Sequence, residues 1–149
     1  MKLGTLCTVD IICCSRDATV RDAAALMRKH HVGDVIVVDD PAGARIPLGI
    51  VTDRDIVVSI VAPGLDPASL RAGDIMSEDL LLANEGDAVD ATIERMRQRG
   101  IRRVPVVDDD GRLAGVVSAD DLLGWLAEEV EALARIAPHQ QSHERQARQ

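Results

Sequence analysis

Aromatic residues are almost missing from this chain of 149 residues, which has no Phe, no Tyr and a single Trp. Hydrophobic residues still make up 46% of it, so a core can form, and that core must be aliphatic. Proteins that bind single-stranded nucleic acid stack the bases on aromatic side chains in a basic groove. The formal net charge of −8 likewise fails to supply the basic surface that neutralises phosphates. We therefore expect no nucleic-acid partner.

Long hydrophobic runs, a disulfide framework and common catalytic motifs are also missing. No apolar run approaches the roughly 18 residues that cross a bilayer, and no segment resembles a signal peptide, so we expect no membrane partner. The three cysteines do not form a disulfide framework, which favours a reducing cytoplasm. The chain has no GxSxG, HExxH or P-loop motif, and its two lysines, Lys2 and Lys29, lie outside the repeated motifs described below. We expect a protein that is not an enzyme.

The usual ligand spacing of a metal site is missing as well. Zinc needs three or four ligands that converge tetrahedrally. Cys13 and Cys14 are neighbours in a predicted strand, so their side chains point to opposite faces of the sheet. His139 and His143 lie in a polar tail without an anchored partner. We expect no metal, and we expect the cysteines to pack as small apolar residues.

The chain does contain an internal repeat. Residues 49–56 read GIVTDRDI and residues 115–122 read GVVSADDL, while VIVVDD at 35–40 returns as VPVVDD at 104–109. Fewer residues separate the matching positions of the two copies after the predicted loop at 41–48 than before it. The first copy therefore has a short insertion in this loop, where insertions are tolerated. A repeated supersecondary unit of this size buries its apolar face against its copy, and sites arise between the two.

Hydrophobic periodicity predicts the order β-α-β-β-α in each copy, and hence an α+β fold made of two modules packed as one pseudo-twofold unit. The expected strands of the first copy are 10–14, 35–38 and 45–51, with helices that begin at Thr19 and Thr52. Those of the second copy are 80–83, 103–107 and 113–117, with helices at 88–99 and 119–136. The predicted domains are therefore 10–62 and 75–136, with a linker at 63–74 and a disordered polar tail at 137–149.

The repeated signature has a structural and a functional interpretation. Thr52 with Asp55, and Ser118 with Asp121, have the spacing of a capping box, which stabilises the start of a helix by about 1 kcal/mol. The same helix start offers free backbone N–H groups and a partial positive charge that bind phosphate. A carboxylate one turn along the helix accepts hydrogen bonds from ribose hydroxyls, as in dinucleotide-binding folds. Both interpretations stay open.

The order of elements and the two signatures resemble a pair of CBS domains, the module named after cystathionine β-synthase, over residues 10–135. The string TDRDIVVSIVAPGLDPASLRAGDIM at 52–76 further resembles small stand-alone bacterial CBS-pair proteins of the hypoxic response protein type. CBS pairs bind adenosine nucleotides in clefts between the copies. The resemblance implies one cleft served by Thr52 and Asp55 with strand residues Cys13, Cys14, Val35 and Ile36. It implies a second served by Ser118 and Asp121 with Leu82, Ala83, Val104 and Pro105.

Charge distinguishes the two predicted clefts. Arg54 stands inside the first signature, where the second has Asp120, and a guanidinium there pairs with phosphate whereas a carboxylate repels it. Arg103, which precedes the second base-contacting strand, is another candidate phosphate ligand. We favour the first cleft and keep the second open, and for both arginines the alternative is a solvated surface position. Pro105 lacks a ladder donor, so its alternative is an ordinary edge-strand proline.

The resemblance implies a regulatory module that senses AMP, ADP or ATP and changes shape or stability on binding, with no obligatory cofactor. It also implies a homodimer formed through the helices, with Trp125 packed on the core or on the second subunit. An unidentified effector protein, or a response to energy or stress state, would then follow from the bound ligand. The alternative is a ligand-free protein–protein interaction module whose clefts have lost binding.

Overall fold

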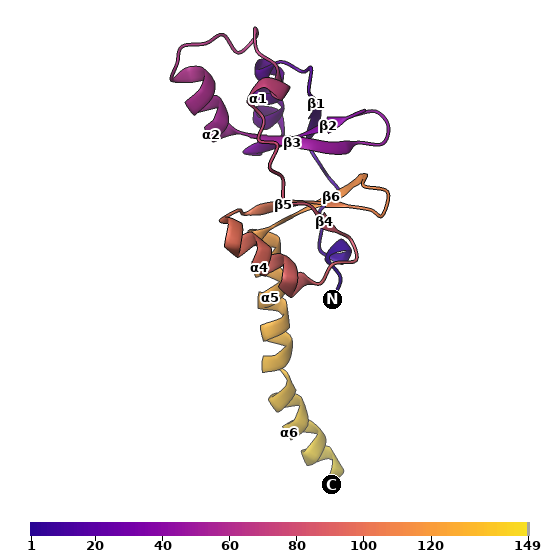
Figure 1. Ribbon diagram of the computed structural model, residues 1–149. Helices are drawn as coiled ribbons and strands as arrows, with labels where there is room; N and C mark the ends of the chain where they lie inside the picture. Colours follow the sequence, from indigo (N-terminus) through magenta and orange to yellow (C-terminus); the bar gives the residue numbers. More distant parts are fainter. Residues whose placement is uncertain (149) are drawn as a thin grey trace.

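The computed structural model describes residues 1–148 as two stacked halves, each built on one three-stranded sheet (Figure 1). The first half contains β1 (Cys13–Ser15), α1 (Val20–His30), β2 (Asp34–Asp39), β3 (Ile46–Thr52) and α2 (Asp53–Ile56). The second contains β4 (Ala83–Asn84), α4 (Val89–Arg99), β5 (Arg103–Val107), β6 (Leu113–Ser118) and α5 (Ala119–Ala134). The predicted α+β pair with the order β-α-β-β-α in each copy is confirmed.

The two sheets have the same topology and the same register. In each, a short first strand runs parallel to the central strand, which pairs antiparallel with the last. Val35 lies opposite Val51 in the first sheet, and the equivalent Val104 lies opposite Val117 in the second. Both hairpins carry a register shift at the same point, after Val37 and after Val106. The sequence repeat is therefore a repeat of backbone geometry.

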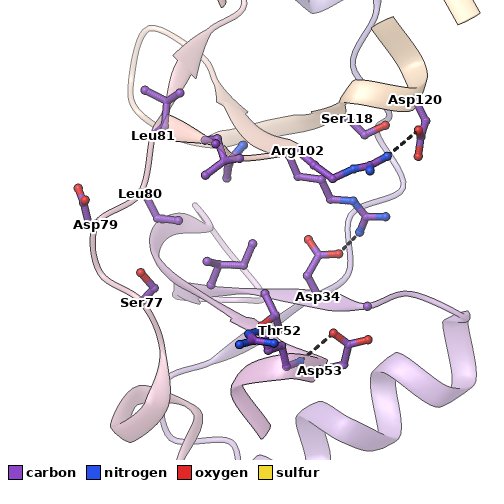
Figure 2. A pocket seen from close by; sticks show the side chains of 17 residues that line it. Asp34, Thr52, Asp53, Ser77, Asp79, Leu80, Leu81, Arg102, Ser118 and Asp120 are labelled. Atoms are coloured by element: carbon purple, nitrogen blue, oxygen red, sulfur yellow. Dashed lines mark hydrogen bonds and ion pairs between the residues drawn. The ribbon is translucent and has the colours of Figure 1, made fainter. Parts of the chain in front are cut away.

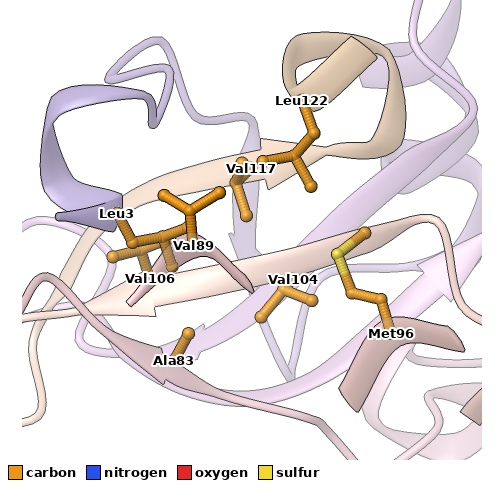
Figure 3. Packing of buried hydrophobic residues seen from close by; sticks show 8 residues of the cluster. All are labelled: Leu3, Ala83, Val89, Met96, Val104, Val106, Val117 and Leu122. Atoms are coloured by element: carbon orange, nitrogen blue, oxygen red, sulfur yellow. The ribbon is translucent and has the colours of Figure 1, made fainter. Parts of the chain in front are cut away.

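Side chains along the central strands point alternately to the two faces of each sheet, and the buried residues form three clusters. Val35 and Val37 point toward the helices of the first half, whereas Ile36 and Val38 join Leu113 in a cluster shared by the two sheets. In the second half, Figure 3 shows the equivalent packing of Val104 and Val106 among residues of both sheet and helices. The remaining members of that second-half cluster are Leu3, Ala83, Val89, Met96, Val117 and Leu122.

Each half is completed by a segment that precedes the first strand of the other half. The 3₁₀ helix η1 (Leu3–Thr5) packs on the second half, where Leu3 is fully buried, and Thr8 forms a bridge with Val116 of β6. Likewise α3 (Ala72–Ile75), from the predicted linker, packs on the first half, and Ser77 bridges Ile50 of β3. As a result, residues 8–12 and 77–81 pass between the two halves.

All three predicted N-caps are present. Thr19, Thr52 and Ser118 each accept a hydrogen bond from the backbone N–H three residues on, and the Asp at that position accepts one in return. The expected helix from Thr52 to about 61 is only partly α-helical, because α2 continues into a π-helical turn, η2 (Val57–Val61). Such turns are rare and often lie near functional sites.

The C-terminal helices extend away from the body of the molecule. α5 is followed by α6 (Ile136–Ala147), and both project beyond the second half in Figure 1. The tail that the sequence predicts to be disordered is therefore helical over these residues, although α6 buries none of its side chains. Pro138 lies in the first turn of α6, where no helical N–H is needed. Within residues 1–148 no helix is long and apolar enough to cross a bilayer.

Candidate functional site

Two pockets lie between the halves. The large pocket has a volume of about 620 Å³, within the 300–1,000 Å³ range of small-molecule sites. It is lined by the end of β3 and start of α2, by residues 77–81 and by the start of β5. The small pocket, of about 210 Å³, is lined by residues 8–12, by β2 and by the end of β6 with the start of α5.

The two pockets are equivalent by the internal repeat. The alignment that superposes the two copies in sequence also matches the two linings position by position. The matching pairs, large pocket first, are Ser77 and Thr8, Ile101 and Val32, Pro105 and Ile36, Ile50 and Val116, and Thr52 and Ser118. Each pocket thus combines the signature of one half with the central strand of the other half.

The repeated glycine of each signature permits this arrangement. A Cβ atom on Gly49 would lie 2.8 Å from the carbonyl oxygen of Ser77, and one on Gly115 would lie 3.1 Å from that of Thr8. Because no side chain intervenes, Ile50 and Ser77 exchange two backbone hydrogen bonds, as do Val116 and Thr8. The glycines therefore bring the segments between the halves against the sheets and set one wall of each pocket.

Polar and charged groups of the two halves face one another across the large pocket, and aliphatic side chains complete its walls. Figure 2 shows Thr52 and Asp53 of the first half on one side and Ser118, Arg102 and Asp120 of the second half on the other. Leu80 and Leu81 come from the segment between the halves. Ile50, Ile101 and Pro105 add aliphatic surface, as expected for a chain with so few aromatic residues.

The arginines of the large pocket differ in their partners. Arg102 pairs with Asp120 at 3.1 Å, and Arg103 of the second half pairs with Asp34 of the first. Asp53 accepts a hydrogen bond from the backbone N–H of Arg54 at 2.8 Å. The guanidinium of Arg54 has no ion-pair partner among residues 1–148. The Arg54 guanidinium is therefore available to pair with an anionic ligand.

The two signature hydroxyls are not equivalent. Ser118 Oγ accepts a hydrogen bond from the N–H of Asp121 and donates one to Asp121 Oδ2 at 2.6 Å. Thr52 Oγ1 accepts the matching bond from Asp55, but its hydroxyl proton has no acceptor within the described part of the chain. Thr52 thus retains a donor at the edge of the large pocket, whereas the Ser118 hydroxyl is occupied by its own cap.

Half of the predicted site residues line the pockets. Thr52, Arg54, Arg103, Pro105 and Ser118 line the large one, and Ile36 and Asp121 line the small one together with Arg103 and Ser118. The sequence placed Ile36 beside Thr52 and Pro105 beside Ser118, whereas the pockets combine them the other way round.

The other predicted residues lie outside the two linings. Val35, Val104, Cys14 and Ala83 are buried in the cores, while Cys13 packs against the cluster shared by the sheets. The carbonyl of Leu82 accepts a bond from Arg95, and Asp55 caps α2. Period-two alternation would have separated Val35 from Ile36, and Val104 from Pro105. Asp34, Asp53 and residues 77–81 line the large pocket but were not among the predicted site residues. Residues 77–81 belong to the segment between the halves, whose position the sequence repeat does not predict.

Two of the three cysteines, Cys7 and Cys14, have thiols whose pKa is raised by their surroundings. Burial raises the pKa of the Cys14 thiol to about 11, and burial with the nearby Glu85 raises that of Cys7. Both thiols are therefore protonated at neutral pH, which makes them weak nucleophiles. Within residues 1–148 no three His, Cys, Asp or Glu side chains are grouped as metal ligands.

Comparison with known proteins gives matches over most of the chain. The CBS domain profile matches residues 3–62 and again 72–128. Hypoxic response protein 1 of Mycobacterium tuberculosis is 30% identical over 118 residues, which is 79% of this chain and 80% of that protein. An uncharacterised protein of Methanopyrus kandleri is 36% identical over 123 residues, or 83% of this chain, but these span only 61% of that longer protein.

Two solved structures extend the likeness to three dimensions. A CBS domain protein from Pyrobaculum aerophilum in complex with AMP is 30% identical, with a TM-score of 0.73 over 82% of this chain and 90% of that one. The hypoxic response protein I structure, with two coordinated zinc ions, is 28% identical, with a TM-score of 0.73 over 83% of this chain and 97% of that one. The AMP and the zinc belong to those proteins.

Proposed function

This chain belongs to the CBS domain family, and from that premise we propose that it is a regulatory module that binds an adenosine-type ligand in the large pocket. A relative of the same fold has been solved with AMP, which supports an adenosine ligand. No catalytic family is indicated by the matches, and we propose that the ligand is bound without being transformed.

The observation that carries this proposal is the large pocket itself. Its volume suits a mononucleotide, and its aliphatic surface from Ile50, Ile101 and Pro105 offers the base an apolar sandwich. The free guanidinium of Arg54 and the spare hydroxyl of Thr52 lie at the same end, where they would bind a phosphate group. A ribose contact for Asp55 and Asp121 stays a prediction, since both carboxylates already cap their helices.

We also propose that the functional unit is a homodimer formed through the final helices of both halves. Val57, Val58 and Val61 of η2, which continues α2, are more than half exposed, and so are Leu123 and Val130 of α5. Apolar side chains this exposed are typical of surfaces that bind a partner. Because the two sets lie on the equivalent helices of the repeat, a second copy could cover both at once. The effector protein that would read the ligand state stays unidentified.

The second candidate function is a ligand-free interaction module. The specific observation in its favour is that Thr52, Asp55, Ser118 and Asp121 all take part in helix caps, so these residues have a structural role without any ligand. This alternative keeps the exposed helix faces as the working surface and assigns no role to the pockets.

Thermal unfolding with adenosine, AMP, ADP and ATP separates the two functions. A ligand at about 100 times its dissociation constant stabilises the native state by about 2.7 kcal/mol, which raises Tm by several degrees in a chain of this size. Arg54→Gln should weaken the binding of the phosphorylated ligands by about tenfold and leave the affinity for adenosine unchanged. Arg112→Gln, on the β5–β6 turn and outside both pockets, is the control for lost charge. No shift with any ligand would favour the interaction module.

A further inference from the structure

One ion pair joins the two halves and borders both pockets. The Arg103 guanidinium from the start of β5 contacts the Asp34 carboxylate from the start of β2, and both residues line the large and the small pocket. Figure 2 shows Asp34 of the first half reaching toward a guanidinium that descends from the second. The Asp34 side chain is only 11% exposed, so its charge depends on this partner more than a surface carboxylate would.

The pair occupies a special position in the repeat. The alignment of the two copies matches Asp34 with Arg103, so they are equivalent positions with opposite charge. Strand register places Asp34 opposite Thr52 and Arg103 opposite Ser118. The pair therefore lies beside both signatures, and each pocket receives one member from each half.

The charges of the small pocket depend on this one arginine. Asp10, Asp34 and Asp121 line it, and Arg103 is its sole cation among the described residues. The large pocket also contains Arg54 and Arg102, of which Arg102 is paired with Asp120. If Arg103 turned toward a phosphate in the large pocket, the small pocket would be left with three carboxylates and would repel an anion.

We propose that Asp34 is an internal competitor for Arg103, and that the two pockets share this cation so that one phosphate-bearing ligand binds per chain. The proposal rests on the proposed function and adds its regulation. A phosphate must displace the Asp34 carboxylate to gain Arg103, and in doing so it breaks the ion pair between the halves. Adenosine, which carries no phosphate, makes no such exchange, so the phosphate is the part of the ligand that uncouples the halves.

Isothermal titration of AMP and adenosine into the full chain tests the competition. Asp34→Asn keeps the shape of the side chain and removes its charge. AMP should therefore bind about fivefold more tightly, while the affinity for adenosine should not change. Asp110→Asn is the matched control, because it removes one carboxylate from the Arg112 ion pair outside both pockets. The wild-type chain should bind one AMP at saturation.

A second variant makes the result specific to Arg103. In an Arg103→Gln background, verified as folded by circular dichroism, Asp34→Asn should give no further gain in AMP affinity. Three results would each overturn the proposal. The wild-type and Asp34→Asn chains could bind AMP with equal affinity, Asp110→Asn could give the same gain in AMP affinity, or each chain could bind two AMP molecules with similar affinity. Failure of both adenosine and AMP to bind any variant would instead refute the proposed function on which it rests.

Discussion

At the scale of single residues, Gly115 has a role that a side chain would prevent. A Cβ atom there would lie 2.6 Å from Cys7 Sγ and 3.1 Å from the Thr8 carbonyl oxygen, so the segment at the small pocket would have to move. Gly115→Ala should lower the free energy of unfolding by about 1–3 kcal/mol, the usual cost of overpacking. Urea unfolding measures this change directly.

Gly124→Ala provides the control for that experiment. Gly124 lies inside α5, and an added Cβ would meet no atom within 4 Å. Alanine is favoured over glycine in a helix interior, so this variant should gain up to about 1 kcal/mol. A loss at Gly124 as large as that at Gly115, or no loss at Gly115, would contradict the role assigned to close backbone approach.

The sequence identified some residues of the candidate site but not which of them contact one another in the folded chain. The hydroxyl and carboxylate of each signature were recognisable from their spacing, because a capping box is local. Asp34 carries no comparable local signal, since its importance comes from Arg103, which is distant in sequence. Arg54 was selected from its charge as a candidate phosphate ligand, but the absence of an ion-pair partner within residues 1–148 could be seen only in the folded chain.

At the scale of elements, the exposed face of α5 predicts self-association. Leu123, Leu126, Val130 and Leu133 follow a heptad spacing and are 41–67% exposed. Val130→Glu should therefore convert a dimer to monomers by placing a charge in the apolar seam, while Glu128→Gln, on the opposite side of the helix, should not. Light scattering coupled to size-exclusion chromatography measures the mass. A monomeric wild type, or a dimeric Val130→Glu variant, would contradict this role for α5.

The order of elements was predictable because hydrophobic period and caps are local signals. Two details of the helices were not. The π-helical turn η2 follows a capped α-helical start, and its hydrogen bonds span one residue more than the sequence pattern indicates. The helix α6 arises in a polar segment whose composition favours disorder, and it follows α5 after the turn at Arg135 and extends away from the body.

At the scale of the whole molecule, the crossing of the chain decides which residues form a pocket. Leu3 belongs to the core of the second half and Ala72 to that of the first, so neither half is a contiguous stretch of sequence. The predicted domain boundaries, drawn from the repeat alone, left residues 1–9 and 63–74 outside both modules. That is why the sequence grouped Thr52 with its own strand, whereas the large pocket groups it with Pro105 of the other half.

The most direct test of the central claim is a methyl NMR titration of the full chain, labelled at its isoleucine side chains, with AMP. Ile50 and Ile101 line the large pocket, Ile36 lines the small one, and Ile93 packs in the second-half core as a reference. We expect saturable shifts at Ile50 and Ile101 with Ile93 unchanged. A nucleotide site in the large pocket would be contradicted if the methyl resonances of Ile50 and Ile101 did not shift at millimolar AMP, ADP or ATP. It would also be contradicted if only the resonance of Ile36 shifted.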